Sequence, residues 1–208
     1  MNTKKIFLGA ALVVVLAACT SIGGSGGAEF PSAEQAVASS WQNMEPGWEK
    51  TLVQDETLKL CSAARLSPNK AEGERIEKMN QAMKVVYPAS GKLVGDWKKG
   101  EAVAQSGYGL RVGDNTPGRA NGGNCYACHQ IDKAELSYGT LGPSLHHFGK
   151  LRGTSDAIVK YTYDKIYNAQ AFSACSNMPR FGHNAILSPE QIADAVALLI
   201  DPQSPVNK

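Results

Sequence analysis

The sequence of 208 residues predicts an all-α protein, in which a mostly helical N-terminal extension precedes a second domain. In the extension, apolar residues recur at spacings of three and four, which is the period of one face of a helix. These residues are Ile76, Met79, Met83 and Val86. In the second domain, residues 188–191 read Ser-Pro-Glu-Gln, a capping box with proline at the first helical position. The apolar positions after it predict a closing helix with one buried face. They are Ile192, Val196, Leu199 and Ile200.

A third observation, the motif Cys125-Tyr126-Ala127-Cys128-His129, indicates what the second domain is built around. Two cysteines three positions apart, followed at once by histidine, are the pattern for covalent attachment of haem c. Cys125 and Cys128 are expected to hold one haem through thioether bonds, and His129 is expected to ligate its iron. A zinc site or a redox pair of cysteines is the alternative, but zinc needs a second close pair of Cys or His, which the sequence lacks. The motif therefore predicts a class I cytochrome c-like haem domain.

Residues 1–18 are predicted to be an export signal, so the protein is expected to be exported. Lys4 and Lys5 precede an apolar run, Ile6 to Ala18, that is too short to span a bilayer comfortably. Without this signal, the 21 basic and 19 acidic side chains become 19 and 19, because it holds two lysines and no acid. This balance gives no case for nucleic-acid binding, which needs a basic stripe.

The end of the signal resembles the box that bacterial lipoprotein signal peptidase reads. The box is Leu16-Ala17-Ala18-Cys19, so Cys19 is predicted to be a lipidated N-terminus. Residues 19–28 would then be a Gly/Ser-rich tether that lets an anchored domain stand off a membrane. Ordinary cleavage further on, after Ala28, is the alternative.

Residues 29–95 form the predicted extension, in which three helical segments are expected. Ser32 can cap a helix that begins near Ala33. The third segment runs through Met79 and Met83, which are predicted to be packing residues because such an apolar stripe usually belongs to a core. A second apolar series lies between these two and ends before Pro68. Its members are Trp48, Leu52, Val53, Leu58, Leu60 and Cys61.

Residues 96–208 form the predicted haem domain. Its first helix is expected from Trp97 to about Val112, although Gly107 and Gly109 have low helix propensity. A later helix is expected over residues 156–172, before the closing helix.

The segment Gly142-Pro143-Ser144-Leu145 matches the loop that lies beside the proximal histidine in cytochromes of this class. A ligating imidazole needs its other nitrogen hydrogen-bonded, which fixes the tautomer, and the carbonyl of Pro143 is the expected acceptor. A plain turn is the alternative.

Met178 is the predicted second axial ligand of the iron. It precedes Pro179, which favours an extended conformation able to project the sulfur inward. His183 is the main rival, whereas His146 and His147 are expected to be surface residues or propionate contacts. Arg180 is expected to pair with a haem propionate or with a partner's carboxylate, and a solvated arginine is the alternative.

Cys61 and Cys175 are the cysteines left once the lipidation and haem cysteines are set aside. Two leftover cysteines in an exported protein indicate one disulfide, which would staple the extension to the Met178 segment. A free Cys175, or one that ligates iron, stays an alternative.

Several segments together resemble SoxX, the monohaem cytochrome subunit of the sulfur-oxidation SoxAX complexes. These segments are residues 95–101 (GDWKKGE), 125–129, 142–143, 178–182 (MPRFG) and 198–207 (LLIDPQSPVN). The resemblance covers the chain from about residue 84 to its end.

The resemblance implies a periplasmic heterodimer with a SoxA-type haem subunit, which carries the catalytic haem and joins thiosulfate oxidatively to a cysteine of the carrier SoxYZ. This chain would pass the released electrons to a soluble cytochrome c and would perform no bond chemistry alone. The two predicted axial ligands also favour a role in electron transfer, since they would leave no open position for a substrate at the iron. The first alternative is a free-standing monohaem electron shuttle. The second is a haem enzyme that binds a small ligand.

Overall fold

The structure is a computed structural model, and it describes residues 32–43, 52–109, 111, 113, 114 and 116–208. The predictions for residues 1–28, with Cys19 among them, lie outside the described residues, as does Trp48. Every regular element in the described part of the chain is a helix, which confirms the all-α class. Within those same ranges, no helix is long and apolar enough to cross a membrane.

The chain divides into two compact units between Val53 and Gln54. In the first unit, α1 (Ala33–Ser40) begins where it was predicted. The Ser32 hydroxyl accepts a hydrogen bond from the Gln35 N–H at 3.2 Å, and the Gln35 side chain accepts one from the Ser32 N–H at 2.8 Å, so the capping box is complete. The second unit holds the rest of the predicted extension together with residues 96–208.

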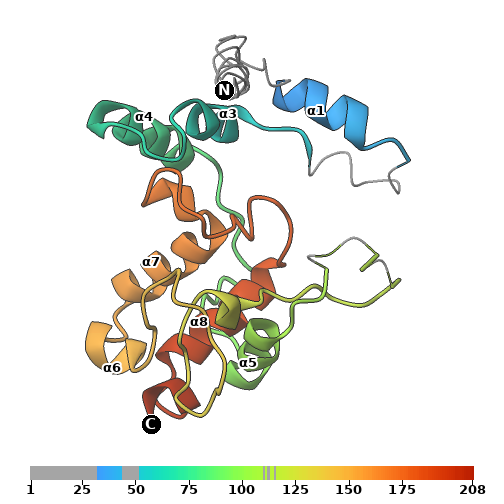
Figure 1. The fold of residues 1–208 in the computed structure, drawn as a ribbon. Coiled ribbons are helices and arrows are strands. Elements are labelled where there is room, and N and C mark those ends of the chain that lie inside the picture. The colour runs from blue at the N-terminus through green and yellow to red at the C-terminus, as the bar shows by residue number, and fades with distance from the viewer. Residues whose placement is uncertain (1–31, 44–51, 110, 112, 115) are drawn as a thin grey trace, which may run out of the picture. The chain divides into compact units, whose positions relative to one another are not determined.

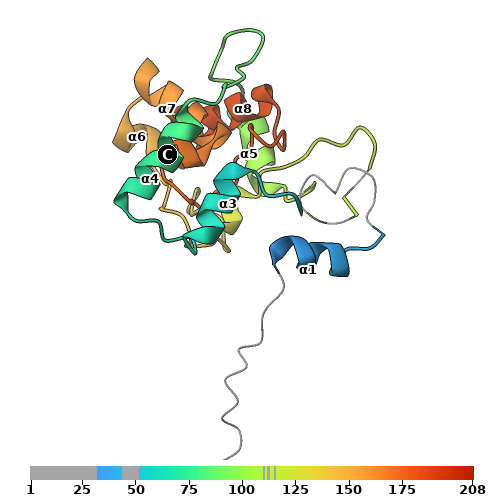
Figure 2. The same ribbon diagram turned by 90° about the horizontal axis from the view of Figure 1, so that it is seen from above.

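The second unit begins with α3 (Glu56–Ala63) and α4 (Lys70–Gln81), which pack as a pair (Figure 2). Asp55 caps α3 and Asn69 caps α4 through side-chain oxygens. The apolar series that predicted α4 extends past its end, because the helix stops at Gln81. Within the series, Ile76 is buried, and Met79 and Met83 are half-buried.

Two helices distant in sequence, α5 (Trp97–Gln105) and α8 (Pro189–Ile200), pack across each other (Figure 1). Gly100 allows this, since a Cβ there would overlap the carbonyl oxygen of Asp194 on α8. The prediction that this first helix reaches Val112 is wrong: α5 ends at Gln105, and Gly109 has a φ of +87°, which a helix cannot continue.

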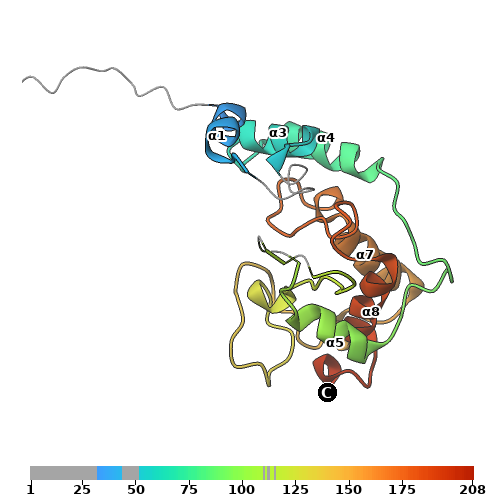
Figure 3. The same cartoon turned by 90° about the vertical axis from the view of Figure 1, so that its right-hand side faces the viewer.

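The remaining elements are η1 (Cys125–Ala127), α6 (Phe148–Arg152), α7 (Asp156–Tyr167), η2 (Ala169–Ala171) and η3 (Pro205–Asn207). Of these, α6, α7 and η3 pack against α8, whereas η1 packs against α5, and η2 against α4 and α7. The prediction of one helix to residue 172 is wrong, because Asn168 leaves the helical conformation and its side chain accepts a hydrogen bond from Gln170 N–H at 3.2 Å in η2. Residues 82–96 run from the end of α4 past α7 to the start of α5 (Figure 3).

The main hydrophobic core lies along α8. Side chains of α5, η1 and α7 also contribute to it, as does Val206 of η3. After α8, the Ser204 hydroxyl donates to the Leu198 carbonyl at 2.5 Å, and the Asn207 amide donates to the Leu199 carbonyl at 3.0 Å. These bonds satisfy carbonyls at the helix end, so the tail is part of the fold. A second, small core joins Cys61, Ile76 and Cys175.

Candidate functional site

The segment 125–129 has a defined local conformation. Asn124 adopts a left-handed conformation with a φ of 46°, and η1 follows. The Cys128 and His129 N–H groups both donate to the Cys125 carbonyl, at 3.1 and 2.9 Å. Cys125 and Cys128 are free and half-buried, and Cys125 packs against the main core. The motif therefore presents two thiols and an imidazole from one tight turn.

The pKa of the Cys125 thiol differs from that of reactive cysteines. Burial raises its pKa to about 12. Cysteines of reactive Cys-x-x-Cys pairs have lowered pKa values, because the thiolate is the nucleophile. Among the described residues, no three His, Cys, Asp or Glu side chains gather as a metal site.

The structure brings His129 and Pro143 together as the sequence predicted. The Nδ1 of His129 lies 2.7 Å from the Pro143 carbonyl oxygen, so Nδ1 carries the proton and donates, and Nε2 is left as an acceptor. Gly142 crosses the face of the ring, where a Cβ would overlap the imidazole. The loop thus orients the ring and fixes its tautomer.

Met178 lies in the segment between η2 and α8. It is half-buried and packs against the same main core as Cys125 and Leu145. Its N–H donates to the Ser176 hydroxyl at 3.2 Å. Met178 and Cys125 thus pack against one core, and no hydrogen bond among the described residues joins His129 to Met178.

The guanidinium of Arg180 is buried, with 3% of the side chain exposed, so the alternative of a solvated arginine is wrong. Its Nη2 donates to Oδ2 of Asp55 at 2.6 Å. Its Nη1 is buried without a hydrogen-bond partner in the described structure. A buried donor of a charged group without an acceptor costs stability, so an anionic acceptor beside Nη1 is expected.

Asp55 is a site residue that the sequence analysis missed. Its Oδ1 accepts the Leu58 N–H at 2.9 Å, so it caps α3 while Oδ2 pairs with Arg180. Burial acts to raise the pKa of Asp55, but the Leu58 N–H, the Arg180 guanidinium and the His183 charge outweigh it, and the pKa lies below its usual value. From the sequence, Asp55 could have been predicted only as the cap of a helix, not as the partner of Arg180.

The rival histidines have other neighbours. His183 Nε2 lies 3.8 Å from Asp55 Oδ2, and burial and the Arg180 charge lower the pKa of His183. The rings of His146 and His147 stack with centroids 3.7 Å apart, and Nε2 of His147 lies 2.7 Å from the Lys208 carbonyl. The ring nitrogens of His146 are buried without partners. Burial is the first cause of its lowered pKa.

Cys61 and Cys175, which the sequence analysis paired, are joined by a disulfide in the structure, with Cα atoms 5.3 Å apart. Both are buried in the small second core. The bond links α3 to the segment that holds Met178.

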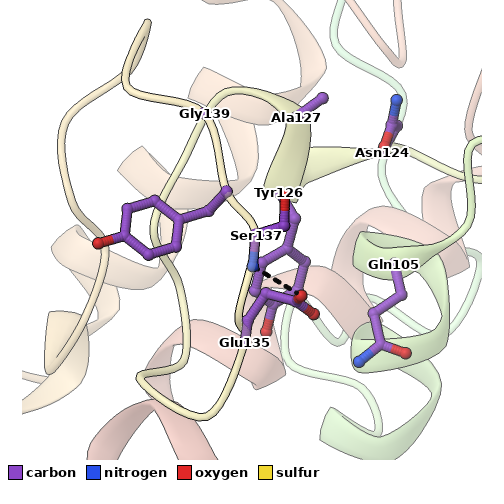
Figure 4. Close-up of a pocket in the computed structure, with 8 residues that line it drawn as sticks. Gln105, Asn124, Tyr126, Ala127, Glu135, Ser137 and Gly139 are labelled. Atoms are coloured by element: carbon purple, nitrogen blue, oxygen red, sulfur yellow. Dashed lines mark hydrogen bonds between the residues drawn. The ribbon is translucent and has the colours of Figure 1, made fainter.

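A polar hollow of about 600 Å³ lies beside residues 124–127 (Figure 4). It is lined by Gln105, Asn124, Tyr126, Ala127, Glu135, Ser137, Tyr138 and Gly139. The Ser137 N–H donates to the Glu135 carboxylate at 3.2 Å at its edge. Neither His129 nor Met178 lines this hollow.

Comparison with protein-family models finds no match. A protein of Aquifex aeolicus (strain VF5), described as an uncharacterized lipoprotein, is 40% identical over 158 residues. The alignment covers 74% of this chain and 73% of the relative. An identity of this size over most of both chains shows common descent. The chain therefore belongs to the same family as the Aquifex aeolicus lipoprotein.

Proposed function

We propose that this chain is a lipid-anchored, SoxX-type cytochrome that carries electrons on one haem c. The observation that carries the proposal is the 2.7 Å contact of His129 Nδ1 with the Pro143 carbonyl. His129 ends a five-residue motif that also holds two free thiols. In the neutral imidazole, the contact with Pro143 makes Nε2, the nitrogen that a haem iron needs, the acceptor. The spacing Cys125-x-x-Cys128-His129 is what covalent haem attachment requires.

The donor set fits haem c. Cys125 and Cys128 would form the thioether bonds, and His129 and Met178 would ligate the iron. The buried, unpartnered Nη1 of Arg180 fits an anion such as a haem propionate. When bound, haem c supplies a group that gains and loses one electron reversibly.

The side chains then have separate tasks. The Pro143 carbonyl holds the Nδ1 proton of His129 and raises the basicity of Nε2. The core against which Met178 packs would help to hold its thioether in place. If His129 and Met178 both bound the iron, the chain would be suited to electron transfer rather than to binding a substrate at the metal.

The place of the chain in a reaction is inferred from its resemblance to SoxX. Oxidative joining of thiosulfate to a carrier cysteine forms one S–S bond and releases the thiol proton and two electrons. A SoxA-type subunit would carry out this step on a SoxYZ-type carrier. This chain would take the electrons one at a time and deliver them to a soluble cytochrome c.

Lipid attachment is supported from two directions. The family relative is described as a lipoprotein. Residues 16–19 of this chain read Leu-Ala-Ala-Cys, which is the pattern read by lipoprotein signal peptidase. Cys19 would carry the lipid, and the protein would face the periplasm from a membrane surface.

Intact mass of the protein, extracted from the membranes of cells that mature c-type cytochromes, tests haem and lipid together. We expect a chain that begins at Cys19 and carries lipid and one haem, and the haem should stay on the tryptic peptide of residues 120–133. Cys125→Ala/Cys128→Ala should remove the covalent haem and leave the lipid. A chain that begins near Glu29 would refute the anchor, and a haem-free mass would refute the cytochrome assignment.

Purification of the native complex tests the SoxX assignment against a free-standing shuttle. We expect a second haem protein to co-purify with the chain. Thiosulfate and a carrier thiol should then reduce cytochrome c with the complex but not with the chain alone. A monomer that accepts and donates electrons without a partner would favour the shuttle, and turnover by the isolated chain would place catalysis on this haem.

A further inference from the structure

The segment that carries Met178 is attached to α3 at two points, one on each side of the methionine. Cys175 is bonded to Cys61, and Arg180 pairs with Asp55 at 2.6 Å. Asp55 caps α3 and Cys61 lies within it, about 9 Å further along the helix axis at 1.5 Å per residue. Both attachments come from a part of the chain that precedes the region of resemblance to SoxX.

Between the two attachments, the backbone has only local support. The Ser176 N–H donates to the Ser173 carbonyl at 3.2 Å, and the Met178 N–H donates to the Ser176 hydroxyl at 3.2 Å. No hydrogen bond among the described residues joins residues 176–179 to another helix. Cys175 itself has a φ of 56°, a conformation that costs a non-glycine residue energy and persists only where neighbours hold it.

α3 is itself held in place by buried hydrogen bonds. Thr57 of α3 accepts a hydrogen bond from Asn80 of α4 at 3.1 Å, and Asn80 accepts one from Asn168 at 3.0 Å. All three side chains are at least 97% buried. The start of the Met178 segment is also held to α4, where the Ala174 N–H donates to Glu77 at 3.1 Å.

We propose that α3 is a clamp for the Met178 segment, with Asp55 and Cys61 as positioning residues that keep the thioether at its binding position. The inference rests on the proposed function, since it concerns retention of an iron ligand. It assigns a role to the part of the extension from Gln54 onward, which a minimal cytochrome c domain does not need. Residues that touch neither haem nor iron would then control how often Met178 leaves the metal.

Displacement of Met178 by added imidazole measures this directly. Imidazole binds only when the methionine is off the iron, so its apparent affinity scales with the fraction of molecules in that state. Two variants open one attachment each. Asp55→Asn weakens the ion pair but keeps an acceptor for the cap, and Cys61→Ser/Cys175→Ser removes the disulfide without leaving a free thiol. Glu56→Gln, an exposed acid in the first turn of α3, is the matched control.

We expect each variant to bind imidazole about tenfold more tightly than the wild type, and Glu56→Gln to stay within about twofold. Urea unfolding of the same proteins separates a clamp from general stability, because lost stability alone lowers the unfolding midpoint without changing the affinity for imidazole. If the cysteine variant does not accumulate in cells, the imidazole affinity of Asp55→Asn alone tests the clamp.

Two results would overturn the inference in distinguishable ways. A wild-type protein without a sulfur-to-iron charge-transfer band would remove the ligand assignment, and the clamp with it. A wild-type protein with a normal band, beside variants whose imidazole affinity is unchanged, would leave the proposed function intact and refute the clamp alone.

Discussion

The contact of Gly142 with His129 shows how a single residue sets the geometry of the site. Only a residue without a side chain lets this loop cross the imidazole, and the crossing places the Pro143 carbonyl 2.7 Å from Nδ1. The glycine is needed for close approach, and its neighbour supplies the acceptor. The two together fix which nitrogen of His129 is free.

Gly142→Ala should therefore displace the ring. We expect a loss of about 1–3 kcal/mol in the free energy of unfolding, which is typical of an overpacked site. Gly73→Ala in α4 is the control, because its Cβ would meet the Ala174 Cβ at an ordinary 3.8 Å. It should stabilise α4 by up to about 1 kcal/mol. Urea unfolding measures both, and equal effects would contradict this account of Gly142.

Asp55 should make stability depend on pH in a known direction. Its folded-state pKa is lowered, so its contribution is fully present above the unfolded pKa of about 3.9 and is lost as the pH falls through the lower folded value. At pH 7, Asp55→Asn should cost about 1–3 kcal/mol, because it weakens the bond to the buried Arg180.

Unfolding of the wild type and of Asp55→Asn across a range of pH tests this sign. The difference in the free energy of unfolding should shrink below about pH 4, as Asp55 becomes neutral like the asparagine. A difference that grows as the pH falls below about 4 would mean that the Asp55 carboxylate is not stabilised in the folded state.

At the scale of elements, the crossing of α5 and α8 positions the cysteine motif. The Gly123 N–H donates to the Val103 carbonyl of α5 at 2.8 Å, and the Asn124 N–H donates to Ser106 at 2.9 Å. The chain leading into Cys125 is thus hydrogen-bonded to α5, and α5 packs closely against α8 at Gly100. A change at the crossing should therefore alter the position of the cysteine motif.

Gly100→Ala should separate the two helices, because the added Cβ would overlap the Asp194 carbonyl. We expect a cost of about 1–3 kcal/mol, although alanine is the better helix former. Ala102→Ser, at an exposed position of the same helix, should change stability by no more than about 0.5 kcal/mol. Thermal unfolding compares them, and a stabilised Gly100→Ala would rule out the close crossing.

Helix starts could be read from the sequence, whereas several helix ends could not. The capping boxes at Ser32 and Ser188 are local patterns, and both helices begin where those patterns predict. The end of α7 depends on Asn168, whose side chain also bonds Asn80 of α4, a partner that no local pattern reveals. Capping is local chemistry, but termination here depends on tertiary contacts.

At the scale of the whole molecule, residues 54–208 form one compact unit. The resemblance to SoxX begins near residue 84, so it implied no role for the segment before it, although the sequence predicted helices there. The cysteine motif could be recognised because covalent haem attachment requires fixed residue types at short spacing, and the haem itself stays a prediction. The ion pair of Asp55 with Arg180 could not be predicted, since its partners lie 125 positions apart.

The central claim is that this chain holds one haem c between His129 and Met178. The absorption spectrum of the oxidised, purified protein tests it most directly. We predict a sulfur-to-iron charge-transfer band that Met178→Ala abolishes, with a lower reduction potential, and that His183→Ala leaves in place. A spectrum unchanged by Met178→Ala, or lost in His183→Ala, would contradict the assignment.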